Sequence, residues 1–381
     1  MPDVFILGIE SSCDETAAAV VRSGEEVVSN VVYSQIATHL PYGGVVPELA
    51  SREHLRAIVP VVRKALDEAN QTYDSINALA VTKGPGLAGA LLVGLSYAKA
   101  LAYALQKPLI GVNHLEGHIH AVLLEERQNG NRELQFPVLA LVVSGGHTHL
   151  YLAERRDASW TYHDVGHTRD DAAGEAFDKV AKLLELGYPG GPIIDYLAQH
   201  GNPRAVKFPF AQIKHRDRNP RNRHPDDVQR VDFSYSGIKT AVLRYAETHD
   251  LRPRIEARRR ALLQVPAPSR EQVLGACDRE TLDLVASFQR AMVNDLVSKT
   301  LSAARERNVA TVLVTGGVAA NSELRSTFAR EAAEEGLPVH FPSRKLSTDN
   351  AAMIAAAAYP RFIAGEFADP ELSADAALKL R

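Results

Sequence analysis

Two histidines four residues apart are candidate metal ligands, because imidazoles at that spacing lie on one face of a helix and can share a metal ion. They are His114 and His118 in the stretch HLEGH. The glutamate stands two residues after the first histidine, so the stretch is not the zinc-protease signature HExxH. Asp349, in the stretch STDN, is a candidate third ligand, and two histidines with one carboxylate leave open positions on Fe(II) or Zn. The alternatives are two surface histidines and an aspartate that only caps a helix.

Three turns of small residues are candidates for binding an anion. They lie at 11–16, 144–146 and 316–317, and each follows an apolar, strand-like stretch. Glycine lets a ligand approach the backbone closely, and free N–H groups in such turns attract phosphate. None of the three matches a Walker loop or a Rossmann fingerprint, and a glycine pair after a strand is usually only a turn. Together in one chain they favour a nucleotide or phosphate site.

A run of acidic residues opens an expected helix at 171–186. Asp171, Glu175 and Asp178 stand at i, i+4 and i+7, so they share one face of that helix. A solvated acidic face is one interpretation. A face turned into a pocket, where carboxylates bind hydroxyl or amine groups of a ligand, is the other.

Strands and helices are expected to alternate, which is typical of α/β architecture. The stretches 4–21 and 138–152 each hold two apolar runs around a small polar turn. We interpret them as a β-turn-β unit repeated in each half of the chain, although two unrelated hairpins have the same pattern. Further strands are expected at 79–82, 109–112, 311–315 and 339–341, and helices at 48–70 with a kink at Pro60, at 87–105, after Asn113, and from about 321 and 349.

The composition is that of a soluble globular protein with two domains or lobes. The chain has 381 residues, too many for one ordinary core, and 45% are hydrophobic and 23% charged. A net charge of −3 gives no overall attraction to nucleic acid, so RNA would need a local basic patch. Two cysteines form no disulfide framework, the start lacks a signal-peptide pattern, and the apolar stretch 87–105 is interrupted by Gly89, Gly94 and Lys99. We therefore expect a cytoplasmic protein in which 87–105 is a buried helix and not a membrane span.

The segment from about 204 to 268 differs from the rest of the chain. It is rich in Arg, Pro, Asn and Asp, and we expect a surface insertion around one ordered piece at 231–245. Its densest positive stretch, 214–230, holds six Lys or Arg residues. A second basic cluster comprises Arg254, Arg258, Arg259 and Arg260. A loop that binds a polyanion and a solvated loop without a role are both compatible with this pattern.

Taken in order, ten stretches resemble the tRNA threonylcarbamoyladenosine-synthesis transferase family (TsaD, also called Gcp, with Kae and Qri relatives). They are GIESSCDETAAAV, GGVVPELASREH, GPGLAGALLVGLSYAKALA, HLEGHIHA, LVVSGGHTHL, DDAAGEAFDKVAKLL, YPGGP, DFSYSGIKTAV, VTGGVAANSELR and STDNAAMIA. They span nearly the whole chain, and the SCDET form of the first turn is similar to the bacterial-type branch.

The resemblance implies an α/β chain with the two-lobed actin/Hsp70/sugar-kinase-like (ASKHA) fold, in which each lobe is a ribonuclease-H-like mixed sheet with helices. An N-terminal lobe is expected at 1–113, completed by C-terminal helices at 350–381. A C-terminal lobe is expected at 114–349, with the metal and adenylate site and the basic insertion at about 204–268.

The resemblance also implies the site. His114, His118 and Asp349 would hold one divalent ion, Fe(2+) being favoured and Zn(2+) the second candidate. Asp14 and Glu15 would lie at the reacting centre. The residues expected to hold an adenylate are Val142, Val143, Ser144, Gly145, Gly146, Asp178, Gly191, Asp195 and Asn321.

The implied reaction is transfer of threonylcarbamoyl from threonylcarbamoyl-adenylate to the N-6 amine of the adenosine 3′-adjacent to the anticodon, in tRNAs reading codons that begin with A, with release of AMP. The implied partners are tRNA, a shorter paralogous subunit (TsaB-like) that contacts the N-terminal lobe, and a small ATPase (TsaE-like). The helix at 48–70 is a candidate for the contact with the paralogue, and a fully buried core helix is the alternative. An O-carbamoyltransferase and an ATPase- or kinase-like module on the same fold are the alternatives.

Overall fold

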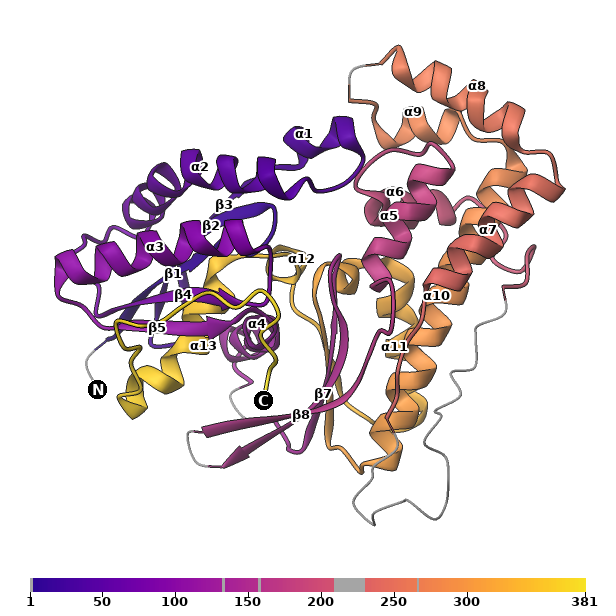
Figure 1. Cartoon of the computed structure of the whole chain (residues 1–381). Coiled ribbons are helices and arrows are strands. Elements are labelled where there is room, and N and C mark those ends of the chain that lie inside the picture. Colours follow the sequence, from indigo (N-terminus) through magenta and orange to yellow (C-terminus); the bar gives the residue numbers. More distant parts are fainter. Residues whose placement is uncertain (1–2, 132–133, 157–158, 209–229, 266) are drawn as a thin grey trace.

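Two five-stranded mixed sheets, each covered by helices, make up the computed structural model. It describes residues 3–131, 134–156, 159–208, 230–265 and 267–381, and the basic stretch at 214–229 lies outside the described residues. Figure 1 shows the two lobes side by side, with the first sheet in indigo and purple.

The first sheet has the order β3-β2-β1-β4-β5. Its strands are β1 (Phe5–Glu10), β2 (Glu15–Arg22), β3 (Glu26–Ser34), β4 (Ala78–Gly84) and β5 (Leu109–Asn113). The β1–β2 and β2–β3 pairs are antiparallel, whereas β4 and β5 run parallel to β1. Apolar side chains fill both faces of β1 and β2, as expected for central strands buried on both sides.

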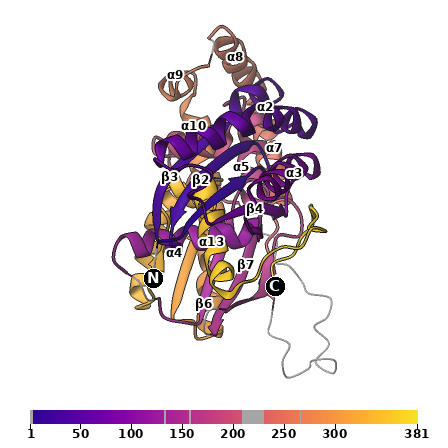
Figure 2. The same cartoon turned by 90° about the vertical axis from the view of Figure 1, so that its left-hand side faces the viewer.

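Helices cover both faces of this sheet. On one face α2 (Pro47–Glu68) and α3 (Ala88–Leu105) lie side by side and share a core with β1, β2 and β4 (Figure 2). On the other face α13 (Ala351–Ala364) and α4 (His114–Gln128) form a second core. The chain after α13 runs back along β5 and β4, where the Ala368 N–H donates to the Leu109 carbonyl and the Asp375 N–H to the Lys83 carbonyl.

The second sheet has the order β10-β9-β6-β7-β8. Its strands are β6 (Val138–Val143), β7 (Thr148–Arg156), β8 (Ser159–His167), β9 (Thr311–Thr315) and β10 (Val339–His340). One face packs on the largest core of the molecule, to which α5 (Ala173–Leu183), α6 (Gly190–Ala198), α7 (Ser236–Thr248), α10 (Arg279–Glu306) and α11 (Ser322–Glu334) contribute. The other face packs on α4.

Helix α4 therefore lies between the two sheets. Ala121 and Leu124 belong to the core of the first sheet, whereas Leu115, Ile119 and Val122 pack on β6, β7 and β9. The expected boundary between the lobes, at 113/114, coincides with the start of this helix. Whatever the first turn of α4 carries is thus placed between the lobes.

The repeated β-turn-β unit is confirmed, because the antiparallel pairs β1–β2 and β6–β7 hold the same positions in two sheets of matching strand order, which two unrelated hairpins would not. The strands expected at 79–82, 109–112, 311–315 and 339–341 and the helix with Pro60 are also present. Helix α3 is the one described helix that is long and apolar enough to cross a membrane. It packs on the sheet along one face only, so the expectation of a buried helix holds for that face, while Leu92 and Tyr103 are exposed.

The insertion is more ordered than the sequence indicates. Besides α7, it contains α8 (Arg252–Leu263), and α9 (Arg270–Gly275) follows shortly after the insertion. Helices α8 and α9 lie beyond α5 and α6 at the tip of the second lobe (Figure 1). Arg258, placed in a surface basic cluster from the sequence, is buried, and its guanidinium donates to the Leu184 carbonyl and the Thr281 hydroxyl. Because it holds α8 on the lobe, Arg258 is not available to bind a polyanion.

Candidate functional site

The histidine pair occupies the first turns of α4, immediately after β5 ends. The Asn113 side chain caps the helix by accepting from the Leu115 N–H at 2.9 Å. This cap fixes the start of the helix, so His114 and His118 follow one another on one face, with ring centroids 4.8 Å apart. Both imidazoles are buried, which excludes the interpretation as two surface histidines.

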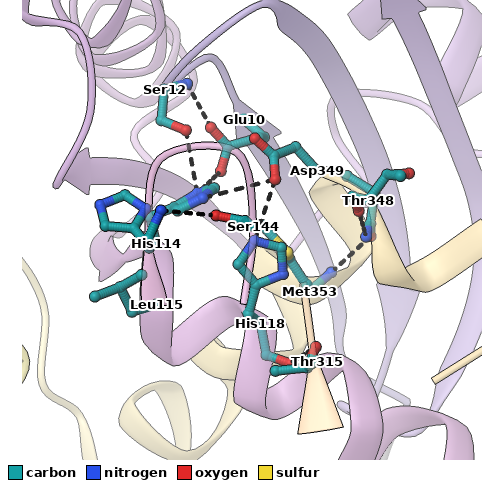
Figure 3. Close-up of polar contacts among 12 residues, drawn as sticks. Glu10, Ser12, His114, Leu115, His118, Ser144, Thr315, Thr348, Asp349 and Met353 are labelled. Carbon is teal, nitrogen blue, oxygen red and sulfur yellow. Dashed lines mark hydrogen bonds and ion pairs between the residues drawn. The ribbon is translucent and has the colours of Figure 1, made fainter. Parts of the chain in front are cut away.

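Asp349 completes a cluster of three candidate metal ligands, one ligand atom from each residue lying within 4.8 Å of the others (Figure 3). Its Oδ1 lies 3.1 Å from His118 Nε2 and 3.6 Å from His114 Nε2. Two ligands at about 2.1 Å from one ion stand roughly 3.0–3.4 Å apart, so the 3.1 Å spacing fits a shared ion and the 3.6 Å spacing is slightly too wide. The interpretation of Asp349 as a helix cap is wrong, since the cap of α13 is Asn350, which accepts from the Met353 N–H.

The charges of the cluster also fit a cation. Neither ring nitrogen of the buried His118 makes a well-directed hydrogen bond within the described part of the chain, although its Nε2 faces Asp349. Burial lowers the pKa of His114, but the Asp349 and Glu10 carboxylates outweigh burial and raise it to about 9. Burial raises the pKa of Asp349, yet the two imidazoles hold it well below its usual range. A divalent ion would replace the proton on His114 and occupy the free nitrogen of His118.

Glu10, the last residue of β1, contacts the ring nitrogen of His114 that does not face Asp349. Its carboxylate lies 3.0 Å from His114 Nδ1 and accepts hydrogen bonds from the Thr82 hydroxyl at 2.7 Å and from the Ser12 N–H. A carboxylate at Nδ1 fixes the tautomer that leaves Nε2 free to bind an ion. Burial alone would raise the pKa of Glu10, but His114 lowers it, so the carboxylate is ionised.

Glu10→Gln is expected to weaken metal binding by about 10- to 100-fold, because the amide neither attracts nor orients the imidazole as a carboxylate does. Competition with a chelator measures this affinity directly. Glu116→Gln is the matched control, since Glu116 is another buried carboxylate near the start of α4 but pairs with Arg361 at 2.6 Å. Equal metal affinity in the two variants would show that Glu10 has no part in orienting the ligand.

Asp14, in the turn between β1 and β2, and Glu15, the first residue of β2, lie beside this cluster and are called the acidic turn below. Burial together with the charges of Asp14 and Asp349 raises the pKa of Glu15 well above its usual range, and the Ser34 hydroxyl donates to its carboxylate at 3.3 Å. Burial raises the pKa of Asp178 in the second lobe, and the Asp14 charge adds to this effect. The acidic turn thus lies within electrostatic reach of both the metal ligands and the opposite lobe.

The turn between β6 and β7 offers open space beside its backbone. Ser144 closes the turn, with its N–H donating to the His147 carbonyl at 2.8 Å and its hydroxyl accepting from the His147 N–H at 3.2 Å. A Cβ atom added at Gly145, Gly146 or Gly317 would meet no neighbouring atom within 4 Å. Gly316 has φ +94° and abuts the Val143 backbone, so only glycine fits there. Two of the predicted small-residue turns therefore meet at the ends of the neighbouring strands β6 and β9.

Val142 and Val143 themselves are completely buried core residues of β6, a strand paired on both sides, so the structure presents neither of them to a ligand. Asp178 on α5 faces the start of α6, where its carboxylate accepts from the Gly190 N–H at 2.7 Å. Gly191 next to it borders open space. Burial raises the pKa of Asp178 to about 6, although the Gly190 and Gly191 N–H groups lower it.

The other acids of the predicted helical face do not join Asp178. Asp171 precedes α5, and both Asp171 and Glu175 pair with Lys179, at 2.6 and 2.9 Å. For these two residues the solvated acidic face is the better description.

Asp195 and Asn321 lie together at the start of α11. Asp195 accepts from the Ser322 N–H and, at 2.7 Å, from the Ser322 hydroxyl, whereas Asn321 caps the helix by accepting from the Leu324 N–H. The Asn321 amide also donates to Gln289 at 2.8 Å. Both side chains thus stabilise the start of α11 through hydrogen bonds within the chain.

Three residues near the site were missed from the sequence. His147 has its ring centroid 6.0 Å from that of His114. Tyr188 lies close enough to Asp14 and Asp178 that their charges add to burial in raising the pKa of its hydroxyl. His54 contacts the acidic turn from α2. An isolated histidine inside the otherwise apolar face of the helix at 48–70 was a signal for the last of these.

Comparison with known proteins gives one consistent result. The model of the family described as tRNA N6-adenosine threonylcarbamoyltransferase matches residues 26–356. A protein of that name from Koribacter versatilis is 76% identical over 381 residues, which is 100% of both chains. Another from Syntrophobacter fumaroxidans is 52% identical over 356 residues, covering 93% of this chain and 94% of its own.

Among solved structures, full-length HypF in a phosphate- and nucleotide-bound form is similar in fold. It superimposes with a TM-score of 0.53 at 12% identity over 96% of this chain and 47% of its own. The expected two-lobed ASKHA fold, with a mixed five-stranded sheet in each lobe, is thereby confirmed.

Proposed function

The chain belongs to the tRNA N6-adenosine threonylcarbamoyltransferase family and transfers a threonylcarbamoyl group to the N-6 amine of an adenosine in tRNA; we propose that its donor is threonylcarbamoyl-adenylate and that the residues between the two lobes carry the transfer. The observation that supports this best is the adjacency of the His114–His118–Asp349 cluster to the acidic turn. The acceptor adenosine is proposed to be the one 3′-adjacent to the anticodon in tRNAs reading codons that begin with A. We place the reaction in the cytoplasm, where its tRNA substrate is found.

The donor is a mixed anhydride of a carbamate and AMP. The adenosine amine attacks the carbamoyl carbon, a C–N bond forms, and the bond from that carbon to the phosphate oxygen breaks. AMP leaves with the electron pair, and the amine loses one proton. Because an adenine amine is a weak nucleophile, positioning and charge stabilisation must supply most of the rate.

The turns at 144–146 and 316–317 would hold the adenylate by their backbone, since they border open space and meet at the ends of β6 and β9. Asp178 and Gly191 would bind the nucleoside end of the donor, and Asp195 and Asn321 would shape the far edge. This arrangement would leave the carbamoyl group toward Asp14 and Glu15.

Glu15 is the better acceptor for the amine proton. Its raised pKa makes the ionised carboxylate a stronger base than an ordinary glutamate, and the Ser34 hydroxyl holds it in place. Asp14 lies near Asp178 and Tyr188, since its charge adds to burial in raising the pKa of both groups. Its carboxylate would position the adenine amine. Asp14→Asn and Glu15→Gln compared in a single-turnover assay separate the two roles, because loss of the base slows transfer without weakening tRNA binding.

His114, His118 and Asp349 would hold one divalent ion, and Fe(2+) is favoured because two histidines and one carboxylate form its usual facial triad. When bound, the ion supplies Lewis-acid polarisation of the carbamoyl carbonyl. The donor is an anion and the side chains around it are acidic, so a cation in the cluster would also offset the repulsion between the donor and these side chains. A kinase-like module would need Mg(2+) and would have no use for two buried imidazoles.

The pH dependence of donor binding tests the role of Asp178. Its pKa of about 6 is raised above that of a free carboxyl, so the ionised form is present above pH 6 and is lost as the pH falls through that value. If ionised Asp178 accepts hydrogen bonds from the ribose hydroxyls, a stable sulfonyl analogue of the adenylate should bind roughly tenfold more weakly one pH unit below that midpoint than it does well above it. Calorimetry measures this, and the Asp178→Asn variant should bind weakly at every pH. The same pH slope in that variant would assign the titration to another group.

The proposed function itself is tested by incubating the protein with threonylcarbamoyl-adenylate, its partners and unmodified tRNA, and then analysing the nucleosides by mass spectrometry. Threonylcarbamoyladenosine at the anticodon-adjacent position is the expected product. Its absence with the intact donor, and its presence with another carbamoyl donor, would overturn the choice of donor.

A groove between α2 and α3 supports the proposal of a shorter paralogous partner, with a small ATPase joining the complex. It is lined by Leu55, Ile58, Val59, Leu92, Val93, Ser96 and Tyr97. Leu55 is 65% and Leu92 54% exposed, which is unusual for apolar side chains that lie together. A paralogue with the same first lobe would present a corresponding pair of helices, so two such faces could bury one another. The expected contact through the helix at 48–70 is therefore proposed to include α3.

A further inference from the structure

One buried imidazole, His54, lies on the inner side of α2 against the turn that carries Asp14 and Glu15. Its Nε2 is 2.9 Å from the Cys13 carbonyl oxygen, and its Nδ1 is 2.7 Å from the Thr16 hydroxyl. The side chain is completely buried. Both nitrogens are thus engaged, one on each side of the acidic pair.

These partners define the tautomer of the ring. A carbonyl oxygen can only accept, so Nε2 carries the proton and donates to Cys13. Nδ1 is then the acceptor, and the Thr16 hydroxyl donates to it. Burial lowers the pKa of His54, so the neutral ring is the stable form at neutral pH.

We propose that His54 is a positioning residue for the transfer reaction, which sets the conformation of the turn so that Asp14 and Glu15 face the donor. The inference rests on the proposed function of those two acids. His54 bridges the residue before the pair and the residue after it, and among the described residues no other side chain forms hydrogen bonds to both Cys13 and Thr16. A change in the imidazole would therefore rotate or loosen the acids without touching the metal ligands.

The same turn of α2 holds the end of β3 and the residue that follows it. The Gln35 amide donates to the Ala50 carbonyl, and the Tyr33 hydroxyl donates to Glu53 at 3.4 Å. The Gln35 N–H donates back to the Asp14 carbonyl at 3.0 Å, so α2 supports the acidic turn by two routes. Since the outer side of α2 lines the proposed partner groove, docking there would act on the helix that holds the acids.

The test compares four variants in single-turnover transfer with saturating adenylate and the full set of partner proteins. His54→Ala removes both hydrogen bonds of the bridge and Thr16→Val removes only the one to Thr16, whereas Thr16→Ser keeps the hydroxyl. Ser29→Ala is the matched control, because the Ser29 hydroxyl makes another buried hydrogen bond to α2, donating to the Ala65 carbonyl at 2.6 Å far from the acids. Metal content, melting temperature and binding of the sulfonyl analogue are measured for each variant.

His54→Ala and Thr16→Val are expected to slow transfer by about 10- to 100-fold with unchanged metal content and analogue affinity. Thr16→Ser and Ser29→Ala should transfer at nearly the normal rate. If His54→Ala fails to fold, the two Thr16 variants decide the question. Full transfer in Thr16→Val, with loss of transfer in Asp14→Asn or Glu15→Gln, would overturn the inference alone. Full transfer in all of these variants would overturn the proposed role of the acids and the inference with it.

Discussion

Replacing His118 by alanine is expected to leave a folded protein that holds little metal and transfers threonylcarbamoyl on the order of a thousandfold more slowly. The side chain is buried, faces Asp349 at 3.1 Å and makes no well-directed hydrogen bond among the described residues, so its removal breaks no structural contact of that kind. Two ligands would remain, which is too few to retain the ion against dilution. Metal analysis of the purified protein and a single-turnover transfer assay measure the two effects.

His120→Ala is the matched control. His120 is also buried on α4, one half-turn further along, but its Nε2 faces the Tyr162 hydroxyl at 3.3 Å in the core under the second sheet. The variant should lose some stability and keep its metal. Normal transfer by a metal-free His118→Ala protein would remove the ion from the mechanism.

The sequence was sufficient for those parts of the fold that rest on local patterns. Apolar runs bounded by small polar turns predicted β1–β2 and β6–β7, and the spacing of apolar residues predicted α2. The histidine pair was also predictable, because the period of a helix alone places His114 and His118 on one face. In each case the signal lies within a few residues of the structure it predicts.

The partners of those residues could not be predicted from local patterns. Asp349 reaches the imidazoles only because α13 packs against α4 across the first lobe. Glu10 ends a strand that is otherwise apolar, and that position was a usable sign of a buried charge with a partner, but only the β1–β4 pairing brings Thr82 to it. Arg258 was misplaced because an arginine among arginines resembles a solvated face until its burial is known.

The largest expected effect outside the metal centre concerns the groove between α2 and α3. Leu55→Asp combined with Leu92→Asp should abolish binding of the shorter paralogue, because each aspartate would be buried without a partner in the middle of the interface. The loss in affinity should be about a hundredfold or more, and multiple-turnover transfer should fall with it. Light scattering of the mixed proteins and a binding titration measure the complex.

Tyr103→Asp provides the control for this surface. Tyr103 is 81% exposed on the same helix α3 but does not line the groove, so its variant should bind the paralogue normally. Metal content should be normal in the double variant and in Tyr103→Asp, because the groove and the His114–His118–Asp349 cluster lie on opposite faces of the first sheet. Normal complex formation by the double variant would move the partner to another surface. A wild-type chain that pairs with itself through the groove, and releases on mutation, would replace the paralogue with a second copy of this chain.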